Sequence, residues 1–358
     1  MLYALRNVGF AGLWNDNERL YMARPKWLPD NFTISLLATV AIASLLPCSG
    51  RVAVVFAWLT NISIALLFFM HGAKLSQQAV LAGAGHWRLH LTVFSATFIL
   101  FPLIGLALRP LLSPVIGDDM YMGILYLCAL PSTVQSSIAF VSLARGNVPA
   151  AICSAAASSL FGIFLTPMIV ALMMNHGNSS GGSSTLDAME KIAIQLLLPF
   201  VAGQIARHWI GSWVDKHKAT LKYLDQSSIL LVVYTAFSSA VIGGIWYQVP
   251  AVSLAVLIAI CIGILALALV LTSMIGKRLG FSHDDRITIL FCGSKKSLAT
   301  GVPMAQVLFS ASNIGMIILP VMLFHQIQLM VCAVLAQRYS ARASEANSRP
   351  FSPERHIS

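Results

Sequence analysis

The stretch Leu290-Phe-Cys-Gly-Ser-Lys-Lys-Ser-Leu-Ala-Thr-Gly-Val-Pro303 decides how the chain is interpreted. It lies in an apolar segment, residues 287–309, that is long enough to cross a membrane, yet it holds two adjacent cations, Lys295 and Lys296. A charge at the centre of a spanning helix costs at least about 2.5–3.5 kcal/mol, so it usually faces a bundle interior or a water-filled cavity. Glycine and proline weaken the helix at the same depth. The stretch therefore predicts a broken helix with a polar site at mid-membrane, as in secondary transporters.

The alternative interpretation is a short helix pair at the membrane edge, with the two lysines extended to the lipid headgroups. The apolar sequence that continues on both sides of the lysines, over residues 287–291 and 302–309, argues against it.

The composition is that of an integral membrane protein. Of the 358 residues, 57% are hydrophobic and 10% are charged, whereas soluble domains carry about 25% charged residues. The net charge of +10 lies mostly in loops and tails, where lysine and arginine orient a chain in the lipid bilayer, so it does not indicate nucleic-acid binding. The six cysteines show no metal-ligand spacing and no disulfide framework.

A second interruption is predicted in the span at residues 120–143. The run Pro131-Ser-Thr-Val-Gln-Ser-Ser137 places five hydroxyl or amide side chains inside an apolar segment. Serine and threonine often hydrogen-bond between neighbouring spans, which is the alternative role for this run. The proline favours a break that lines a site.

The chain has room for ten spans, five in each half, and these include spans expected at residues 91–108, 120–143 and 227–243. We expect a first repeat at 31–174, a Gly/Ser linker at 175–187 and a second repeat at 188–337. We expect residues 1–30 to form an N-terminal segment, a candidate interfacial segment, and residues 338–358 to form a disordered cytoplasmic tail. The interrupted spans, the fourth and the ninth, then occupy matching positions in two inverted halves. The distribution of lysine and arginine puts both termini in the cytoplasm.

The predicted site is positively charged. All thirteen Asp and Glu residues map outside the span centres, whereas Lys295, Lys296 and His325 lie inside spans. Two confined cations favour an anionic solute, and we expect Lys296 to line the site. Burial and a neighbouring like charge both favour proton release from lysine, so either lysine, or His325, is a candidate for coupling to H⁺. The candidate solute- and ion-binding residues are Pro131, Ser132, Thr133, Gln135, Ser136, Ser137, Asn147, Ser294, Lys295, Lys296, Ser297, Thr300, His325, Gln326 and Gln328.

A metal site is not expected. His86 and His90 have the spacing of a helical ligand pair, but no carboxylate or cysteine accompanies them.

Several of these motifs together resemble the bile acid:sodium symporter superfamily. The resemblance rests on the runs at 130–137, 144–148 and 293–303 and covers about residues 30–340. The runs His325-Gln-Ile-Gln328 and Trp87-Arg-Leu-His90 narrow it to the symporter-like (SBF-like) branch, which has bacterial members and includes the seventh member of the vertebrate solute carrier family. The resemblance implies an all-α polytopic protein of ten transmembrane helices, built as two inverted five-helix repeats. It also implies that discontinuous helices 4 and 9 cross near two sodium sites and a cavity for organic anions.

The sequence departs from that family at the sodium sites. Ser136 and Ser137 fall where the family carries a Ser-Asn pair for sodium, so Na⁺ near them remains one expectation. Residues 291–296 fall where the family carries a glutamate and a glutamine, and here the glutamate is missing and lysine is present. We therefore expect an ammonium group of Lys295 or Lys296 to stand in for a bound sodium ion.

The function expected from the sequence is secondary transport of a small organic anion across the inner or plasma membrane, in a bacterium. One alternative is a sodium-coupled symporter of the bile-acid type. Another is a membrane regulator of ion balance that carries no organic solute. An enzyme is not expected, because the sequence shows no nucleophile–base pair, metal cluster or nucleotide-binding loop. The expected partners are the lipid bilayer and the solute.

Overall fold

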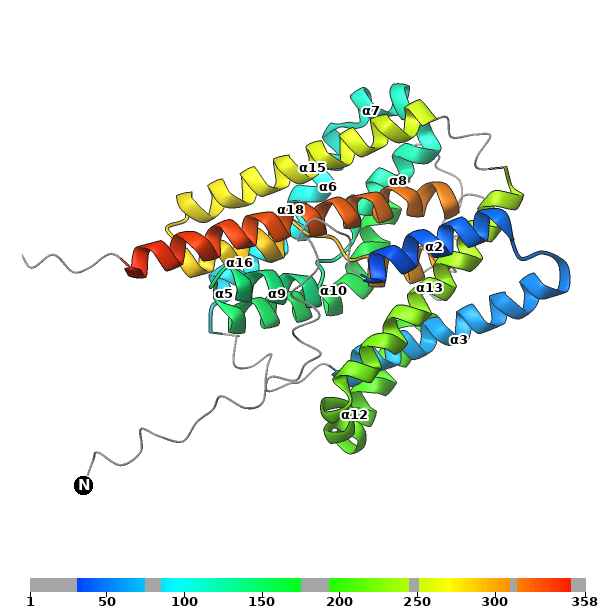
Figure 1. The fold of residues 1–358 in the computed structure, drawn as a ribbon, viewed down its shortest axis with the longest axis horizontal. Helices are drawn as coiled ribbons and strands as arrows, with labels where there is room; N and C mark the ends of the chain where they lie inside the picture. Colours follow the sequence, from blue (N-terminus) through cyan, green and yellow to red (C-terminus); the bar gives the residue numbers. More distant parts are fainter. Residues whose placement is uncertain (1–30, 75–84, 175–192, 245–250, 310–313, 349–358) are drawn as a thin grey trace, which may run out of the picture.

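The computed structural model describes residues 31–74, 85–174, 193–244, 251–309 and 314–348, and within these ranges it contains helices and no strand (Figure 1). The predicted N-terminal segment and the predicted Gly/Ser linker lie outside the described residues. Six helical segments are long and apolar enough to cross a membrane: Gly50–Lys74, Trp87–Ala107, Val148–Met173, Ala219–Ile242, Val252–Arg278 and Ile314–Arg342. The chain is therefore a multi-pass membrane protein, as its composition predicted.

In the first half, the helices are α2 (Asn31–Leu45), α3 (Gly50–Lys74), α5 (Trp87–Ser95), η1 (Ala96–Leu100), α6 (Phe101–Ala107), α7 (Arg109–Ile116), α8 (Asp118–Ala129), α9 (Gln135–Leu143) and α10 (Val148–Met174). In the second half, they are η2 (Ala193–Leu197), α12 (Leu198–Lys216), α13 (Lys218–Ile242), α15 (Ala251–Arg278), α16 (His283–Gly293), α17 (Leu298–Leu308) and α18 (Ile314–Ser348).

The helices form two groups. In the small helix group, α3 packs against α12 and α13, and α2 packs against α13 (Figure 1). The large helix group contains the helices from α5 to α10 and from α15 to α18, with α8 packed on α18 and α16 packed between α5, α9, α10 and α15. Contacts of α13 with α17 and α18 join the groups. Each group combines helices from both halves of the chain.

Close backbone approach holds the small helix group together. A Cβ atom added at Gly72 of α3 would overlap the carbonyl of Phe200, and one added at Gly203 of α12 would overlap the carbonyl of Phe69. The two glycines therefore let α3 and α12 cross with their backbones in contact, as small residues do in membrane helix pairs.

The large helix group contains both predicted interruptions. The chain leaves the helix at residues 130–134, between α8 and α9, and at residues 294–297, between α16 and α17. Pro131 ends α8 because proline disfavours helical backbone in the residue before it, and Leu130 is accordingly extended. After the second break α17 begins at an N-cap, Ser297, whose side chain accepts from the backbone N–H of Thr300 at 3.3 Å.

Two helix bounds differ from the sequence prediction. The span predicted to begin at residue 227 begins as α13 at Lys218, which brings Asp225 inside a helix that can cross the membrane. The tail predicted to be disordered from residue 338 is helical as far as Ser348. Residues 338–348 lack glycine and proline and contain three alanines, so nothing in them stops α18 before Pro350.

Candidate solute site

The two breaks contact each other directly. The backbone N–H of Ser297 donates to the carbonyl of Pro131 at 2.9 Å, and the hydroxyl of Ser132 donates to the carbonyl of Cys292 at 2.6 Å. The hydroxyl of Ser137 donates to the carbonyl of Phe291 at 3.4 Å. Backbone groups released by one break are therefore bonded by the other, as a membrane interior requires.

Lys296 fills the point where the breaks meet. It is 1% exposed, and its Nζ donates to the carbonyls of Thr97, Cys128 and Leu130 at 2.8, 2.8 and 2.7 Å. Its Nζ also lies 4.2 Å from the ring centroid of Phe101, within cation–π range. An ammonium group has three N–H donors, so all three are used. Lys296 is thus coordinated by backbone oxygens in the way that a metal cation would be.

A widened helical turn supplies one of these oxygens. Over η1 the helix takes the π form, and the N–H of Phe101 bonds to the carbonyl of Ala96, five residues earlier, rather than to that of Thr97. The residue five after Thr97 is Pro102, which has no N–H to donate. The carbonyl of Thr97 is therefore available to Lys296. Pro102 was visible in the sequence, within the predicted span at 91–108, but sequence reasoning did not predict that it would free the carbonyl of Thr97.

Gln328 fixes the backbone of the second break. Its side-chain oxygen accepts from the N–H of Lys296 at 2.9 Å, and its side-chain nitrogen donates to the carbonyl of the same residue at 2.8 Å. The same nitrogen lies 2.9 Å from Nδ1 of His325. The polar run of α18 that the sequence singled out is thus directed at the break.

Lys295 points the other way, towards α9. Its side chain is fully buried, at 0% exposure. Its Nζ lies 3.3 Å from the hydroxyl oxygen of Ser136, and the same atom lies 4.2 Å from the ring centroid of Phe140. The hydroxyl of Thr133 lies within 2.7 Å of that of Ser136 and 3.0 Å of that of Ser137. The two hydroxyls proposed from the sequence near a sodium ion, those of Ser136 and Ser137, therefore form a cluster with that of Thr133, and an ammonium group lies beside it.

A cavity of about 650 Å³ lies between the small and the large helix groups. Its wall includes Thr133, Gln135, Ser136, Ser297, Thr300 and His325, six of the residues singled out in the sequence. The other nine do not line it, namely Pro131, Ser132, Ser137, Asn147, Ser294, Lys295, Lys296, Gln326 and Gln328. From the sequence we expected Lys296 to line the cavity. In the structure it does not, because all three of its N–H donors bond to carbonyls where the two breaks meet.

Three of the residues outside the wall support the breaks instead. The ring of Pro131 packs on α10 at Gly162, and a Cβ atom added to this glycine would lie 2.6 Å from Cβ of Pro131. The hydroxyl of Ser294 donates to the carbonyl of Leu290 at 2.6 Å and closes the end of α16. The amide nitrogen of Asn147 donates to the carboxylate of Asp285 at 2.9 Å and links the starts of α10 and α16.

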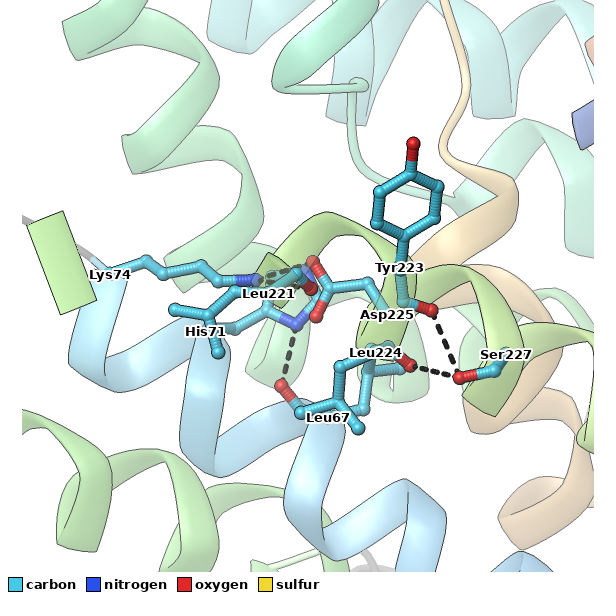
Figure 2. Close-up of polar contacts among 8 residues, drawn as sticks. All are labelled: Leu67, His71, Lys74, Leu221, Tyr223, Leu224, Asp225 and Ser227. Carbon is cyan, nitrogen blue, oxygen red and sulfur yellow. Dashed lines mark hydrogen bonds and ion pairs between the residues drawn. The ribbon is translucent and has the colours of Figure 1, made fainter. Parts of the chain in front are cut away.

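Sequence reasoning missed a charged cluster on the cavity wall. His71 and Lys74 of α3 and Asp225 of α13 line the cavity, and Figure 2 shows the lysine extended towards the carboxylate with the imidazole beside them (Figure 2). The Lys74 Nζ lies 2.5 Å from Oδ2 of Asp225. Nδ1 of His71 donates to the carbonyl of Leu67 at 2.8 Å. The sequence offered only a weak signal, because these residues stand at the predicted ends of spans and meet only through the packing of α3 on α13.

In the described part of the chain, no three or more His, Cys, Asp or Glu side chains form a group that could hold a metal ion. His90, one of the histidines with ligand spacing, has its Nδ1 2.7 Å from the hydroxyl oxygen of Ser154.

The chain is similar to known transporters over most of its length. The model of the SBF-like CPA transporter family matches residues 30–341. The Pseudomonas aeruginosa "Uncharacterized protein PA2026" is 64% identical over 325 residues, which cover 91% of this chain and 97% of that protein. The Escherichia coli "Putative symporter YfeH" is 55% identical over 322 residues, 89% of this chain and 96% of that protein. The Xenopus tropicalis "Sodium/bile acid cotransporter 7" is 26% identical over 330 residues, 89% and 92% of the respective chains.

Proposed function

This chain belongs to the SBF-like CPA transporter family, so it is a membrane transporter and not an enzyme, and we propose that it carries a small organic anion by alternating access. The proposed architecture is ten spans in two inverted repeats, with α8–α9 as the fourth span and α16–α17 as the ninth. Lipid surrounds the protein, and the solute binds in the cavity between the small and the large helix groups. Movement of one group against the other then exposes the cavity to either side of the membrane.

The observation that carries this proposal is the coordination of Lys296 by three backbone carbonyls where the two breaks meet. An ammonium group bound by these three carbonyls holds the broken helices together in the place of a sodium ion. Lys295 adds a second positive charge 3.3 Å from Ser136, so a metal cation among these hydroxyls would be repelled. We therefore propose that transport is independent of sodium and that H⁺ is the candidate coupling ion.

Cations on the cavity wall support an anionic solute. Lys222 is exposed, lines the cavity and forms no ion pair with any residue that the structure describes. The other charged residues of the wall are paired, Lys74 with Asp225 and Asp215 with Arg207, and His71 and His325 add two imidazoles. If both termini are cytoplasmic, as the loop charges predict, then Lys74 and Lys222 stand at the cytoplasmic end of the cavity.

The test is solute flux in proteoliposomes. Radiolabelled hexanoate and cholate are offered in the presence of a sodium gradient, a proton gradient or neither, with wild-type protein and with Lys296→Gln. We expect flux without sodium in the wild type and loss of flux in Lys296→Gln, because the amide cannot supply three donors to the carbonyls. The vertebrate relatives are named for sodium and bile acid, so the sodium-coupled alternative is tested in the same experiment. A steep sodium dependence that persists in Lys296→Gln would establish that alternative, and no flux of any solute would favour a regulator of ion balance.

A further inference from the structure

The ion pair between Lys74 and Asp225 leaves half of a buried carboxylate unused. Asp225 is 7% exposed, and its Oδ2 receives the ammonium group of Lys74 at 2.5 Å, while Nζ of Lys74 also donates to the carbonyl of Leu221 at 3.4 Å (Figure 2). Oδ1 is buried and has no hydrogen-bond partner among the described residues. A buried acceptor without a donor is costly, and more so when it belongs to a charged group. Because Asp225 lines the cavity, a bound solute can supply the missing donor.

A second unused acceptor lies on the large-helix-group wall of the same cavity. Thr300, in the first turn of α17, is 3% exposed and lines the cavity, and its Oγ1 is buried without a hydrogen-bond partner in the described part of the chain. Threonine in a helix commonly bonds back to a carbonyl four residues earlier, as Thr97 and Thr272 do here at 2.9 and 2.7 Å. The residue four before Thr300 is Lys296, whose carbonyl is taken by Gln328. The hydrogen-bonding capacity of the Thr300 hydroxyl is therefore unused by the described residues.

The molecule offers an internal comparison for these two atoms. Oγ of Ser238 in α13 is also buried and without a partner among the described residues, but Ser238 does not line the cavity. Burial of a polar atom thus occurs elsewhere in the fold, and what distinguishes Asp225 and Thr300 is that both border one cavity, from α13 and from α17.

We propose that Asp225 Oδ1 and Thr300 Oγ1 form a subsite that accepts a hydrogen-bond donor of the solute, and that the transported anion therefore also carries a hydroxyl or a protonated amine. This inference rests on the proposed function. The anionic group of the solute pairs with Lys222, the exposed cation of the same wall. The donor reaches the oxygen of Asp225 that Lys74 leaves unused, and a protonated amine makes the stronger, charge-assisted bond there. Solutes that lack a donor leave both acceptors unpaired and are discriminated against.

The test compares matched solutes with wild-type protein in nanodiscs. Binding of hexanoate, 6-hydroxyhexanoate and 6-aminohexanoate is measured by calorimetry, and 5β-cholanate and cholate form a larger pair that differs only in hydroxyl groups. We expect the donor-bearing member of a set to bind at least about tenfold more tightly, the factor that one hydrogen bond of about 1.4 kcal/mol provides. If the amine is the natural donor, 6-aminohexanoate binds more tightly than 6-hydroxyhexanoate. If the hydroxyl is the natural donor, 6-hydroxyhexanoate binds more tightly.

Variants assign the preference to the two atoms. Thr300→Val keeps the shape of the side chain and removes the hydroxyl, and we expect it to lower the preference for donor-bearing solutes several-fold. Asp225→Asn should remove the preference for the amine. Because Asp225→Asn leaves Lys74 without its partner, the double variant Lys74→Met with Asp225→Asn removes both charges and keeps the comparison valid. Ser238→Ala, the matched control, should bind every solute as the wild type does.

The outcomes separate this inference from the proposed function. Equal binding of donor-bearing and donor-free anions, or a preference that persists in Thr300→Val and in the double variant, would overturn the subsite and leave anion transport standing. Absence of binding and of flux for all five solutes would count against the proposed function and would remove the subsite with it.

Discussion

The ammonium nitrogen of Lys296 lies 2.7 Å from the carbonyl oxygen of Leu130, the residue at which the helix of the first break ends. The two residues are 166 positions apart in the sequence, so this hydrogen bond exists only when both halves of the chain are in place. It joins the C-terminal end of α8, where partial negative charge gathers, to a buried cation.

The two adjacent lysines should differ in their effect on stability. Lys296→Met leaves three buried carbonyls without a donor, and each costs about 1–3 kcal/mol, so we expect a loss of at least about 3 kcal/mol. Lys295→Met loses one side-chain hydrogen bond and should be destabilised by less. Unfolding in mixed micelles, followed by helix content, measures both. Equal losses would show that the carbonyl contacts of Lys296 contribute nothing specific.

Replacement of Gln328 should loosen the second break. Gln328→Leu removes two hydrogen bonds to the backbone of Lys296 and leaves its buried N–H and carbonyl unpaired, at a cost of about 2–4 kcal/mol. The control is Gln306→Leu, which loses a single long bond of 3.4 Å to the carbonyl of Val232. Thermal unfolding in detergent compares the stability of the two variants. A smaller loss of stability in Gln328→Leu than in Gln306→Leu would contradict the role of Gln328 in fixing the second break.

The first break should depend on the absence of a side chain at Gly162. An added Cβ would lie 2.6 Å from Cβ of Pro131, so Gly162→Ala forces the break or α10 to shift, at a cost of about 1–3 kcal/mol. We expect flux to fall at least several-fold. Gly263→Ala on α15 is the matched control, because nothing lies within 4 Å of its added Cβ, and it should be neutral or slightly stabilising. Wild-type flux in Gly162→Ala would show that the break tolerates displacement.

The small helix group should lose thermal stability when α3 and α12 are forced apart. Gly72→Ala or Gly203→Ala places a methyl group against a backbone carbonyl that has no freedom to rotate away. We expect each variant to lower the melting temperature, and the double variant to cost less than the sum of the two, because one displacement relieves both overlaps. Differential scanning fluorimetry of the three variants provides the measurement, and strict additivity would indicate two independent contacts.

The sequence predicted the large features of the fold for local reasons. Pro131 ends a helix through its own backbone chemistry, and the apolar runs around Lys295 and Lys296 place two cations at membrane depth whatever the packing. The two breaks could therefore be located from residues alone. Ser136 and Thr300, which closely follow those breaks, do line the cavity.

The features that the sequence did not reveal depend on contacts between distant elements. Adjacent residues on a helix or turn point in different directions, and only the crossing of the breaks shows that Lys296 turns to carbonyls and Lys295 to Ser136. Likewise the sequence pattern predicted that Asp225 lies in a loop, because a charged residue near the end of an apolar run usually marks the end of a span. Its pairing with Lys74, 151 positions earlier, lets α13 begin before it.

The widened turn of η1 has a consequence for how the protein is made. The three oxygens that bind Lys296 belong to Thr97, Cys128 and Leu130. These residues precede the lysine by 199, 168 and 166 positions, so they are synthesised well before it. Until Lys296 is synthesised, the chain lacks the side chain that pairs with these three carbonyls in the folded protein. A chain that ended after α10 would accordingly carry all three carbonyls without the donor that joins them in the complete fold.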